Sequence, residues 1–400
     1  MTNTDEARIK QVLSRGVENI FPNYEFVASK MGTGEQLSLY FGIDPTGPTL
    51  HIGHLIPLLK LSQFQKLGHK VTILIGDFTA TIGDPTDKAS ARKKLSREEV
   101  LENMKKYKKQ ISRFIELDGE NAAEWKFNSK WLGKMKFGDV LELASLMTVD
   151  QMLKRDMFAT RQEEGKPIYI HEFLYPLMQG YDSVALDVDG EIGGNDQTFN
   201  MLAGRDLMKN LKNKEKFVIA MKLLVDPSGK KMGKSENNMV SLDQDHLEMF
   251  GKIMSWGDEL IVPGFEIITD LPAEDIVSIK ESLDSGKNPR DFKVHLARSI
   301  VGLCHGEKKA KAAEANFDKT FARGGVPDGI EEVSVSSDAM LSDILTTQQL
   351  VVSKGEYRRL VSEGAISNMD TGEKITDPNA KVSSGTFKIG KRRFIKIKVL

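Results

Sequence analysis

The chain has 400 residues, of which 40% are hydrophobic and 28% charged, and its formal net charge is −1. This composition is ordinary for a globular protein of two or three domains, and the near-neutral balance does not by itself indicate a nucleic-acid-binding protein. A single cysteine, Cys304, excludes an intramolecular disulfide and a cysteine-based zinc site.

The N-terminus and the length of the apolar runs both bear on the cellular location. The first residues, MTNTDEARIK, are polar and lack the apolar core of a signal peptide. No apolar run approaches the roughly 20 residues that a membrane-spanning helix needs. One cysteine also fits a reducing compartment. We therefore expect a cytoplasmic protein with no membrane partner.

In chain order, the first clear unit is a strand, a turn, a helix and a second strand. Residues 37–42 and 71–76 are predicted strands, and the second is a continuous apolar run that ends in glycine. A helix with leucines at helical spacing is expected to begin near His51. Two more strands are expected at 183–192 and 217–224. Together they predict an α/β domain with a Rossmann-like, doubly wound parallel sheet.

Residues 126–170 interrupt this alternation with apolar side chains in long helical patterns. The apolar residues are Trp131, Leu132, Met135, Phe137, Val140, Leu141, Leu143, Leu146 and Met147. The pattern fits a helical insertion that extends the core as well as it fits an apolar subunit interface, and both interpretations stay open.

The rest of the chain is predicted to form two further domains. A helical pattern continues to about residue 325 and meets a linker rich in glycine at 324–329. The sequence then changes to a helix pair followed by short strands. We therefore expect a catalytic domain over 1–245, an all-α domain over 246–329 and a small α+β domain over 339–400.

The first chemical motif follows the first predicted strand. Residues 40–54 read YFGIDPTGPTLHIGH, which leaves a strand, turns, and enters a helix with His51 and His54 on one face. At a helix N-terminus, imidazoles add donors to the backbone N–H groups and to the positive end of the dipole. Gly53 leaves room for a flat group against the backbone. The arrangement suits a nucleoside triphosphate, whereas an isolated pair of this kind is more often a surface feature.

The second motif is the basic sequence KKMGKS at residues 230–235, which follows a predicted strand and a Asp-Pro-Ser-Gly turn. Alone, it is most simply a solvated basic turn. Flexible lysines flanked by glycine can instead close over a pyrophosphate. Its position after the histidine motif favours this second interpretation.

A third set of polar residues lies between these motifs. Tyr175, Gln179 and Asp182 are spaced four and three apart, so one helix face would present all three. The sequence GGNDQ follows at residues 193–197. On spacing alone, a polar helix face is the simpler interpretation.

Taken together, the three motifs resemble those of class I aminoacyl-tRNA synthetases, and the constellation looks like tyrosyl-tRNA synthetase of the bacterial type. The first two resemble the HIGH and KMSKS signatures, with Gly233 in place of the first serine of the second. Asn195 stands where this family commonly has serine or threonine. The resemblance extends over essentially the whole chain and is strongest at 37–95 and 168–240.

The resemblance implies roles for individual residues in binding tyrosine. Tyr40 and Asp182 would hydrogen-bond the substrate phenol. Tyr175, Gln179 and Asp84 would surround the ammonium group, and Gln197 would lie near the carboxylate.

The resemblance also implies an ATP site. Its residues would be Gly42, Asp44, His51, Gly53, His54, Gly193, Asp196, Lys231 and Lys234. Among these, Asp196 would bind the ribose, and the catalytic groups would be His51, His54, Lys231 and Lys234, with the lysines at the leaving pyrophosphate. Lys88 and Arg92 lie in a basic loop that approaches phosphate in this family, although a solvated loop explains them equally well.

The reaction implied is activation of tyrosine by ATP to tyrosyl-adenylate and pyrophosphate, followed by transfer of tyrosine to the 3′ end of tRNA(Tyr). The tyrosine carboxylate is already ionised at pH 7, so activation needs no general base, only positioning and stabilisation of negative charge. Mg²⁺ would arrive with ATP, and neither a protein metal site nor a tightly bound cofactor is expected. The expected partners are tRNA(Tyr), tyrosine, ATP and a second copy of the chain, but not DNA.

Three alternatives belong to other classes. A tryptophanyl-tRNA synthetase shares the catalytic fold, but Tyr40 together with Asp182 argues against it. A small-molecule nucleotidylyltransferase also uses a His-x-Gly-His motif, but such enzymes are usually much shorter. A non-catalytic RNA-binding protein on a synthetase scaffold would be expected to lack the histidines or lysines, and all are present.

The C-terminal segment resembles a small RNA-binding module that is shared with a small-subunit ribosomal protein. The resemblance places Ser353, Arg358 and Arg359 on a helix pair, and Gly364 would end its second helix. A basic hairpin would follow, with Gly390, Lys391, Arg392 and Arg393. Arginine suits phosphate through bidentate contacts, so these are candidates for contacts with tRNA. A solvated basic tail is the alternative.

Overall fold

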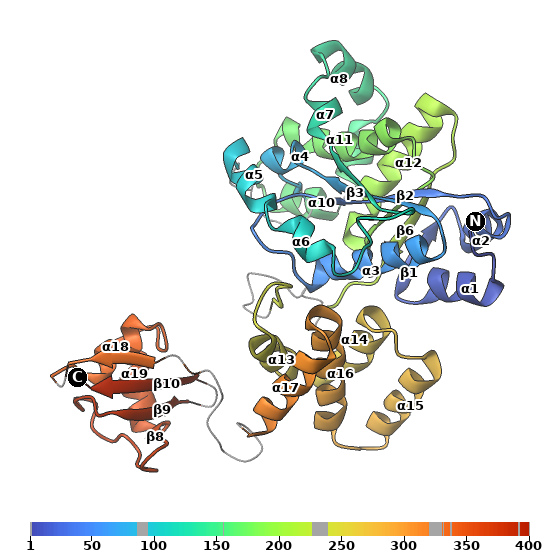
Figure 1. Ribbon diagram of the computed structural model, residues 1–400. Helices are drawn as coiled ribbons and strands as arrows, with labels where there is room; N and C mark the ends of the chain where they lie inside the picture. The colour runs from blue at the N-terminus through green and yellow to red at the C-terminus, as the bar shows by residue number, and fades with distance from the viewer. Residues whose placement is uncertain are drawn as a thin grey trace. The chain divides into compact units, whose positions relative to one another are not determined.

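The computed structural model describes residues 2–85, 95–154, 156–225, 239–319, 330, 332–336, 338–390 and 393–399. The chain divides into two compact units, Met1–Gly306 and Glu307–Leu400, which are treated separately below (Figure 1). This division falls within the stretch that the sequence assigns to the helical domain, so most of those helices belong to the same unit as the catalytic sheet.

Among its described residues, the first unit holds a six-stranded sheet. In spatial order its strands are β1 (Val17–Phe21), β6 (Phe217–Met221), β5 (Gly190–Gly194), β2 (Ser38–Ile43), β3 (Lys70–Ile75) and β4 (Glu124–Phe127). All neighbouring pairs are parallel except β1 with β6, which is antiparallel. The predicted doubly wound sheet is therefore confirmed, with one antiparallel edge strand added.

The strand order reverses between β2 and β5. From β2 the chain moves outward to β3 and β4, and it then returns to build β5 and β6 on the other side. In open α/β sheets, ligands bind outside the carboxyl ends of the strands at such a switch point. The sequences that leave β2 and β5 at this edge are the turn after Ile43 and the loop after Gly194.

Helices cover both faces of this sheet. Figure 1 shows α3 (Ile52–Lys66) on one face and α11 (Ile170–Leu186) with α12 (Thr198–Lys212) on the other. Among the described residues before 240, the remaining helices are α1 (Glu6–Ser14), α2 (Tyr24–Gly32), α4 (Thr79–Ile82), α5 (Arg97–Met104), α6 (Tyr107–Ile111), α7 (Ser129–Leu132), α8 (Phe137–Ala144), α9 (Val149–Leu153), α10 (Asp156–Glu163) and the short η2 (Asn195–Gln197).

A helical region completes the first unit, as predicted for the stretch from 246. Its elements are α13 (His246–Met254), η4 (Asp258–Leu260), α14 (Ile261–Ile268), α15 (Ala273–Asp284) and α16 (Pro289–His305). Helix α13 packs on α16, and α14 packs on both α16 and α3, so the helical region shares contacts with the sheet domain.

Some predicted boundaries were wrong. The expected strand at 183–192 combines the last turn of α11 with the start of β5, because Val184 continues the helical apolar face of α11 and packs with Leu207 and Met208 of α12. The expected strand at 217–224 ends at Met221. Strands β1 and β4 were not predicted, and residues 126–127 belong to β4 rather than to a helical insertion.

The helical insertion extends the core with one side, as one of the two interpretations of its sequence expected, and its role as a subunit interface stays a prediction. Leu132 and Leu143 are buried, whereas Phe137 and Leu141 are exposed, with 77% and 55% of their surface open to solvent. Ile170, where α11 begins, is 80% exposed. One side of these helices extends the core, and the other leaves large apolar side chains in solvent.

The second unit is a small sheet with two helices, preceded by α17 (Glu307–Phe317). Its described strands pair in the order β7 (Glu332–Val335), β10 (Arg393–Val399), β9 (Gly385–Ile389) and β8 (Ile366–Asn368), and its helix pair is α18 (Leu341–Thr347) and α19 (Lys354–Ser362). Side chains from the helix pair and from the sheet form one apolar core. The predicted helix pair and strands are present, and β7 lies before the predicted start at residue 339.

Candidate active site

The turn after β2 leads directly into the N-terminus of α3. His51 is the N-cap of this helix, and its Nδ1 accepts a hydrogen bond from the Gly53 N–H at 3.1 Å. The Nδ1 of His54 accepts from the His51 N–H at 3.3 Å, and the two rings lie 4.0 Å apart. Because both Nδ1 atoms accept, each neutral ring carries its proton on Nε2, where it acts as a donor. A Cβ at Gly53 would lie 2.9 Å from the His51 ring, so this capping arrangement requires glycine.

Asp44 in the same turn connects the histidine motif to α11. Its Oδ2 accepts a hydrogen bond from the Tyr175 hydroxyl at 2.7 Å, and its Oδ1 accepts from Thr79 Oγ1 at 2.7 Å. A Cβ at Gly76 would lie 1.9 Å from Asp44 Oδ1, so glycine at the end of β3 makes room for this carboxylate. Burial and the neighbouring Asp44 raise the pKa of Tyr175, which therefore keeps its proton.

The two residues expected at a substrate phenol, Tyr40 and Asp182, are both buried. The Tyr40 hydroxyl lies 3.0 Å from Ser183 Oγ. Asp182 accepts hydrogen bonds from Trp131 Nε1 at 2.7 Å and Asn128 Nδ2 at 3.2 Å. Burial raises the pKa of the Asp182 carboxyl, and these two donors oppose that rise because they stabilise the charged form.

Burial is also the largest cause that raises the pKa of Tyr40, followed by the charges of Glu191 and Asp182. Tyr40 and Glu191 are direct partners in the register of β2 and β5. A tyrosine hydroxyl so close to two carboxylates stays protonated and acts as a donor.

The residues expected at an ammonium group form a chain of amide hydrogen bonds. Gln197 Nε2 donates to Asp84 Oδ2 at 2.8 Å. Asn200 Nδ2 donates both to Gln197 Oε1 at 2.9 Å and to Gln179 Oε1 at 3.0 Å. Gln179 Nε2 in turn donates to Glu191 Oε1 at 3.2 Å. The structure therefore brings Asp84, Gln179 and Gln197 together, with Asn200 between them.

The loop after β5 places the remaining predicted nucleotide residues at the same edge. Gly193 and Gly194 end β5, and Asp196 lies in η2. A Cβ at Gly194 would lie 2.4 Å from Asp196 Oδ1, so glycine here allows the carboxylate to fold back on the loop. Gly42 lies in β2 and is exposed.

The lysine motif lies outside the described residues, as do Lys88 and Arg92 of the basic loop. The segment that follows the lysine motif is described, and it pairs with the start of α3. The Ile52 N–H donates to the Val240 carbonyl at 3.0 Å, and the Leu242 N–H donates to the Leu50 carbonyl at 2.8 Å. Residues 240–242 thus lie beside His51.

The chain was compared with known proteins. The family described as "tRNA synthetases class I (W and Y)" matches residues 32–322. A tyrosine–tRNA ligase 2 of Vibrio vulnificus is 43% identical over 397 residues, which covers 98% of this chain and 99% of the relative. A tyrosine–tRNA ligase of Carboxydothermus hydrogenoformans is 44% identical over 402 residues, which covers 97% of both chains. The chain belongs to the class I tyrosyl-tRNA synthetases.

Solved structures agree with this at the level of the fold. A tyrosyl-tRNA synthetase of Archaeoglobus fulgidus, complexed with L-tyrosine, has a TM-score of 0.62 at 23% identity and covers 78% of this chain and 100% of that structure. A C-terminally truncated mitochondrial tyrosyl-tRNA synthetase of Aspergillus nidulans has a TM-score of 0.64 at 24% identity and covers 78% of this chain and 94% of that structure.

The second unit of this synthetase separates its predicted basic residues into two groups. Arg358 and Arg359 are exposed on α19, and Arg359 pairs with Glu363 at 3.0 Å. Arg393 instead faces the module, where it donates to the Leu350 carbonyl and to Glu356 Oε1. Lys391 and Arg392 lie outside the described residues. Ser353 caps α19 through the Glu356 N–H. Gly364, the predicted end of the second helix, has φ of +62°, and Gly390 of the predicted hairpin has φ of +63°.

Several site residues were missed by the sequence reasoning. They are Thr79, Asn128, Trp131, Ser183, Glu191, Asn200 and Lys216. Asn128 and Trp131 follow β4, so recognising that strand would have put them at the binding edge. Glu191 and Lys216 are charged residues within or beside buried strands, a pattern that by itself indicates a pair in the core.

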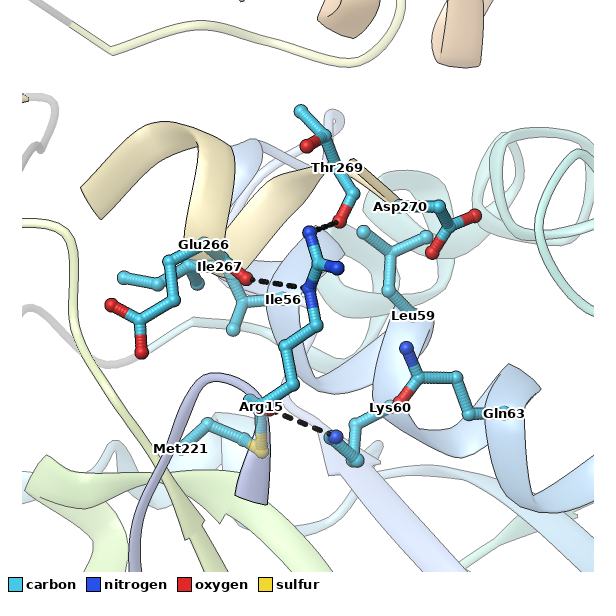
Figure 2. A pocket seen from close by; sticks show the side chains of 10 residues that line it. All are labelled: Arg15, Ile56, Leu59, Lys60, Gln63, Met221, Glu266, Ile267, Thr269 and Asp270. Atoms are coloured by element: carbon cyan, nitrogen blue, oxygen red, sulfur yellow. Dashed lines mark hydrogen bonds between the residues drawn. The ribbon is translucent and has the colours of Figure 1, made fainter. Parts of the chain in front are cut away.

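A pocket elsewhere in the first unit, between α3 and α14, has a structural rather than a catalytic character (Figure 2). Arg15 donates to the carbonyls of Phe265 and Glu266 at 3.1 Å and of Leu271 at 2.5 Å, and it therefore holds the end of α14. Lys60 donates to the Arg15 carbonyl at 3.0 Å, and burial lowers the pKa of its ammonium to about 7. These cations satisfy backbone carbonyls and join α3 to α14.

Among the residues that the structure describes, no group of three or more His, Cys, Asp or Glu side chains is arranged to hold a metal ion. In the same part of the chain, no helix is long and apolar enough to cross a membrane.

Proposed function

We propose that this chain activates L-tyrosine with ATP at the carboxyl edge of β2 and β5 and then transfers it to the 3′ end of tRNA(Tyr). The observation that carries this proposal is a buried tyrosine–aspartate pair, Tyr40 and Asp182, beside a chain of amides that ends at Asp84. A molecule that fits needs a phenol at one end and an ammonium group at the other.

At the phenol end, the two protein groups are complementary to a hydroxyl. Tyr40 keeps its proton and donates, whereas the Asp182 carboxylate accepts, so a phenol can receive from one and give to the other. An amino acid without the hydroxyl would leave Asp182 and Tyr40 each lacking one hydrogen bond in a buried site. Rejection of phenylalanine by tyrosyl-tRNA synthetases is the standard example of this effect.

At the ammonium end, the hydrogen-bond directions favour a cation. The Tyr175 hydroxyl gives its proton to Asp44, so it offers a lone pair to other groups. The Gln179 amide gives its N–H to Glu191, so it offers its oxygen. Asp84 adds a negative charge, and Gln197 would lie near the substrate carboxylate.

The ATP site is proposed along the same edge. His51 and His54 would donate from Nε2 to phosphate oxygens, Gly42, Gly53 and Gly193 would admit the nucleotide, and Asp44 and Asp196 would line it. Lys231 and Lys234 would stabilise the leaving pyrophosphate, with Lys88 and Arg92 as further phosphate contacts and Mg²⁺ arriving with ATP. The pairing of residues 240–242 with the start of α3 supports the placement of the lysines.

The C-terminal module is proposed to hold the tRNA. Arg358 and Arg359 on α19, with Lys391, Arg392 and Arg393 of the β9–β10 hairpin, would meet RNA phosphates, and Arg393 would also fix the hairpin against α19. We assign catalysis to 1–245, the anticodon side of the tRNA to 246–329 and RNA binding to 339–400.

A cytoplasmic homodimer is also proposed. Phe137, Leu141, Val149 and Ile170 are large apolar residues of the insertion, and each is more than half exposed. Exposed apolar side chains that gather in one region mark an association surface. A self-complementary pairing of this region would cover them in a symmetric dimer.

The decisive test is ATP–pyrophosphate exchange measured with tyrosine, tryptophan and phenylalanine. We expect kcat/KM for tyrosine to exceed that for tryptophan and phenylalanine by orders of magnitude. Asp182→Ala should cripple exchange with tyrosine while the thermal unfolding of the protein stays close to wild type. Exchange with tryptophan as good as with tyrosine, or wild-type rates for Asp182→Ala at low tyrosine, would overturn the assignment.

A further inference from the structure

A buried ion pair lies behind the proposed tyrosine site. Lys216 precedes β6 and is fully buried, and its ammonium pairs with Glu191 Oε2 in β5. The same ammonium donates to Ser183 Oγ at 2.8 Å and lies 5.8 Å from the centre of the Tyr40 ring. Burial lowers the pKa of Lys216, whereas the charge of Glu191 raises it.

The packing of α11 on α12 makes room for this lysine. A Cβ at Gly204 of α12 would lie 2.7 Å from Lys216 Nζ and 2.8 Å from Ser183 Oγ. A Cβ at Gly180 of α11 would lie 3.0 Å from the Gly204 nitrogen. The two glycines therefore let the helices approach closely, and Gly204 also leaves room for the Lys216 ammonium group.

Such a pair is a poor way to gain stability. Desolvation of two charges offsets most of their attraction, and apolar residues of similar volume often serve a core as well or better. The Lys216–Glu191 pair can, however, orient neighbouring polar groups, which apolar residues could not do.

We propose that Lys216 and Glu191 are positioning residues that fix the direction of hydrogen bonds at both ends of bound tyrosine. The inference rests on the proposed binding mode. One carboxylate serves both ends: Glu191 Oε1 accepts from Gln179, and Oε2 accepts from Lys216.

At the ammonium end, Glu191 decides how the Gln179 amide is turned. A carboxylate can only accept, so it holds the Gln179 N–H₂ group. The amide oxygen is left to accept from Asn200 Nδ2 at 3.0 Å and, in the proposed binding mode, from the substrate ammonium group. A neutral partner at position 191 could accept or donate and would allow the amide to turn over. Lys216 holds the Glu191 carboxylate in place through the ion pair.

At the phenol end, Lys216 acts through Ser183. An ammonium group can only donate, so Ser183 Oγ accepts from Lys216. In the proposed arrangement, Ser183 then gives its own proton to the Tyr40 oxygen, which lies 3.0 Å away. Tyr40 then directs its proton at the substrate phenol. On the other side of the substrate, the Asp182 carboxylate accepts the hydrogen bond from the phenol.

The test uses Lys216→Met, Glu191→Gln and the double variant in ATP–pyrophosphate exchange, with thermal unfolding recorded for each. Lys216→Met leaves a buried carboxylate without its cation, so it should destabilise the protein and raise the KM for tyrosine by about 10- to 100-fold, as expected when hydrogen bonds to charged groups are lost. The double variant removes both charges and should regain stability but keep the raised KM and a lowered preference for tyrosine over phenylalanine.

Ser183→Ala separates the two ends. It breaks the path to Tyr40 and leaves the Glu191–Gln179 contact, so preference for tyrosine over phenylalanine should fall while the KM for phenylalanine changes little. In Lys216→Met, by contrast, the KM should rise for both amino acids. The KM for ATP should change less than that for tyrosine in every variant.

The matched control is the buried pair Arg161–Glu172, joined at 2.6 Å. Arg161→Met with Glu172→Gln also removes a buried ion pair from the first unit, and it should leave the preference for tyrosine over phenylalanine unchanged. A double variant of Lys216 and Glu191 with wild-type KM and preference would overturn the inference. Absence of tyrosine-dependent exchange in the wild type would instead overturn the proposed function.

Discussion

Trp131→Phe is the sharpest probe of the phenol site, because it removes one N–H group and keeps an aromatic ring. Trp131 Nε1 lies 2.7 Å from Asp182 Oδ1, and Asp182 is only 3% exposed, so water cannot readily replace the lost donor. Loss of a hydrogen bond to a buried charged group costs about 1.5–3 kcal/mol, which corresponds to roughly a 10- to 150-fold fall in kcat/KM for tyrosine.

The same variant should change the pH dependence in a defined direction. Burial already raises the pKa of Asp182, and the bond from Trp131 is the largest of the influences that lower it. Without that bond the carboxyl holds its proton to higher pH, and the protonated form cannot accept from a phenol as the carboxylate does. The acidic limb of kcat/KM for tyrosine should therefore move to higher pH.

The assay is ATP–pyrophosphate exchange at low tyrosine across the acidic limb of the pH profile, which reports groups of the free enzyme. Trp125→Phe in β4 is the matched control, and its limb should stay at the wild-type position. An unchanged kcat/KM and an unmoved limb in Trp131→Phe would refute the argument that Asp182 acts as a carboxylate held by its donors.

Three further predictions concern the other parts of the chain. Lys234→Ala should lower the rate of activation by about 10²- to 10³-fold while tyrosine affinity changes little, because its contact strengthens as charge develops on the leaving group; pre-steady-state kinetics that show only weaker tyrosine binding would contradict it. Truncation after Gly329 should leave ATP–pyrophosphate exchange near normal and greatly weaken tRNA charging. Charging by the full chain should also fall more steeply with added salt than charging by the truncated protein. Equal charging by both proteins would show that the module does not hold the tRNA. Phe137→Glu should shift the protein to monomers in analytical ultracentrifugation, and an unchanged dimer would show that the insertion is not the interface.

The sequence predicted the sheet better than it predicted the residues that support the candidate site. The apolar run at 71–76 and the turn into His51 carry strong local patterns, and both lie where expected. The strand Glu124–Phe127 is short, with side chains that are all only half-buried, so no clear period marks it. Because this strand was not predicted, Asn128 and Trp131, which follow it, were not recognised as site residues.

The error at residues 183–192 has a related cause. A helix ending and a strand beginning within a few residues give one mixed apolar pattern, and only packing decides where one stops. Asp187 adopts a left-handed conformation with φ of +52° and ends α11 there. Contacts between residues far apart in sequence, such as Lys216 with Ser183, leave no local pattern at all.

Two separate chains of hydrogen bonds suggest how this site selects its substrate. One chain contains Tyr40, Ser183, Lys216, Glu191, Gln179, Asn200, Gln197 and Asp84. The other contains Asp182, Asn128, Thr79, Asp44 and Tyr175.

In the proposed binding mode, tyrosine joins these chains at both of its ends. Its phenol would bridge Tyr40 and Asp182, and its ammonium group would bridge Gln179 and Tyr175. Because the protein groups are already held by their neighbours, binding orders few side chains and retains most of its free energy. Phenylalanine would make the ammonium bridge alone and leave Tyr40 and Asp182 each lacking one hydrogen bond in a buried site. Discrimination then depends on how firmly each chain is held, which explains why residues such as Lys216 and Trp131, without touching the substrate, should alter it.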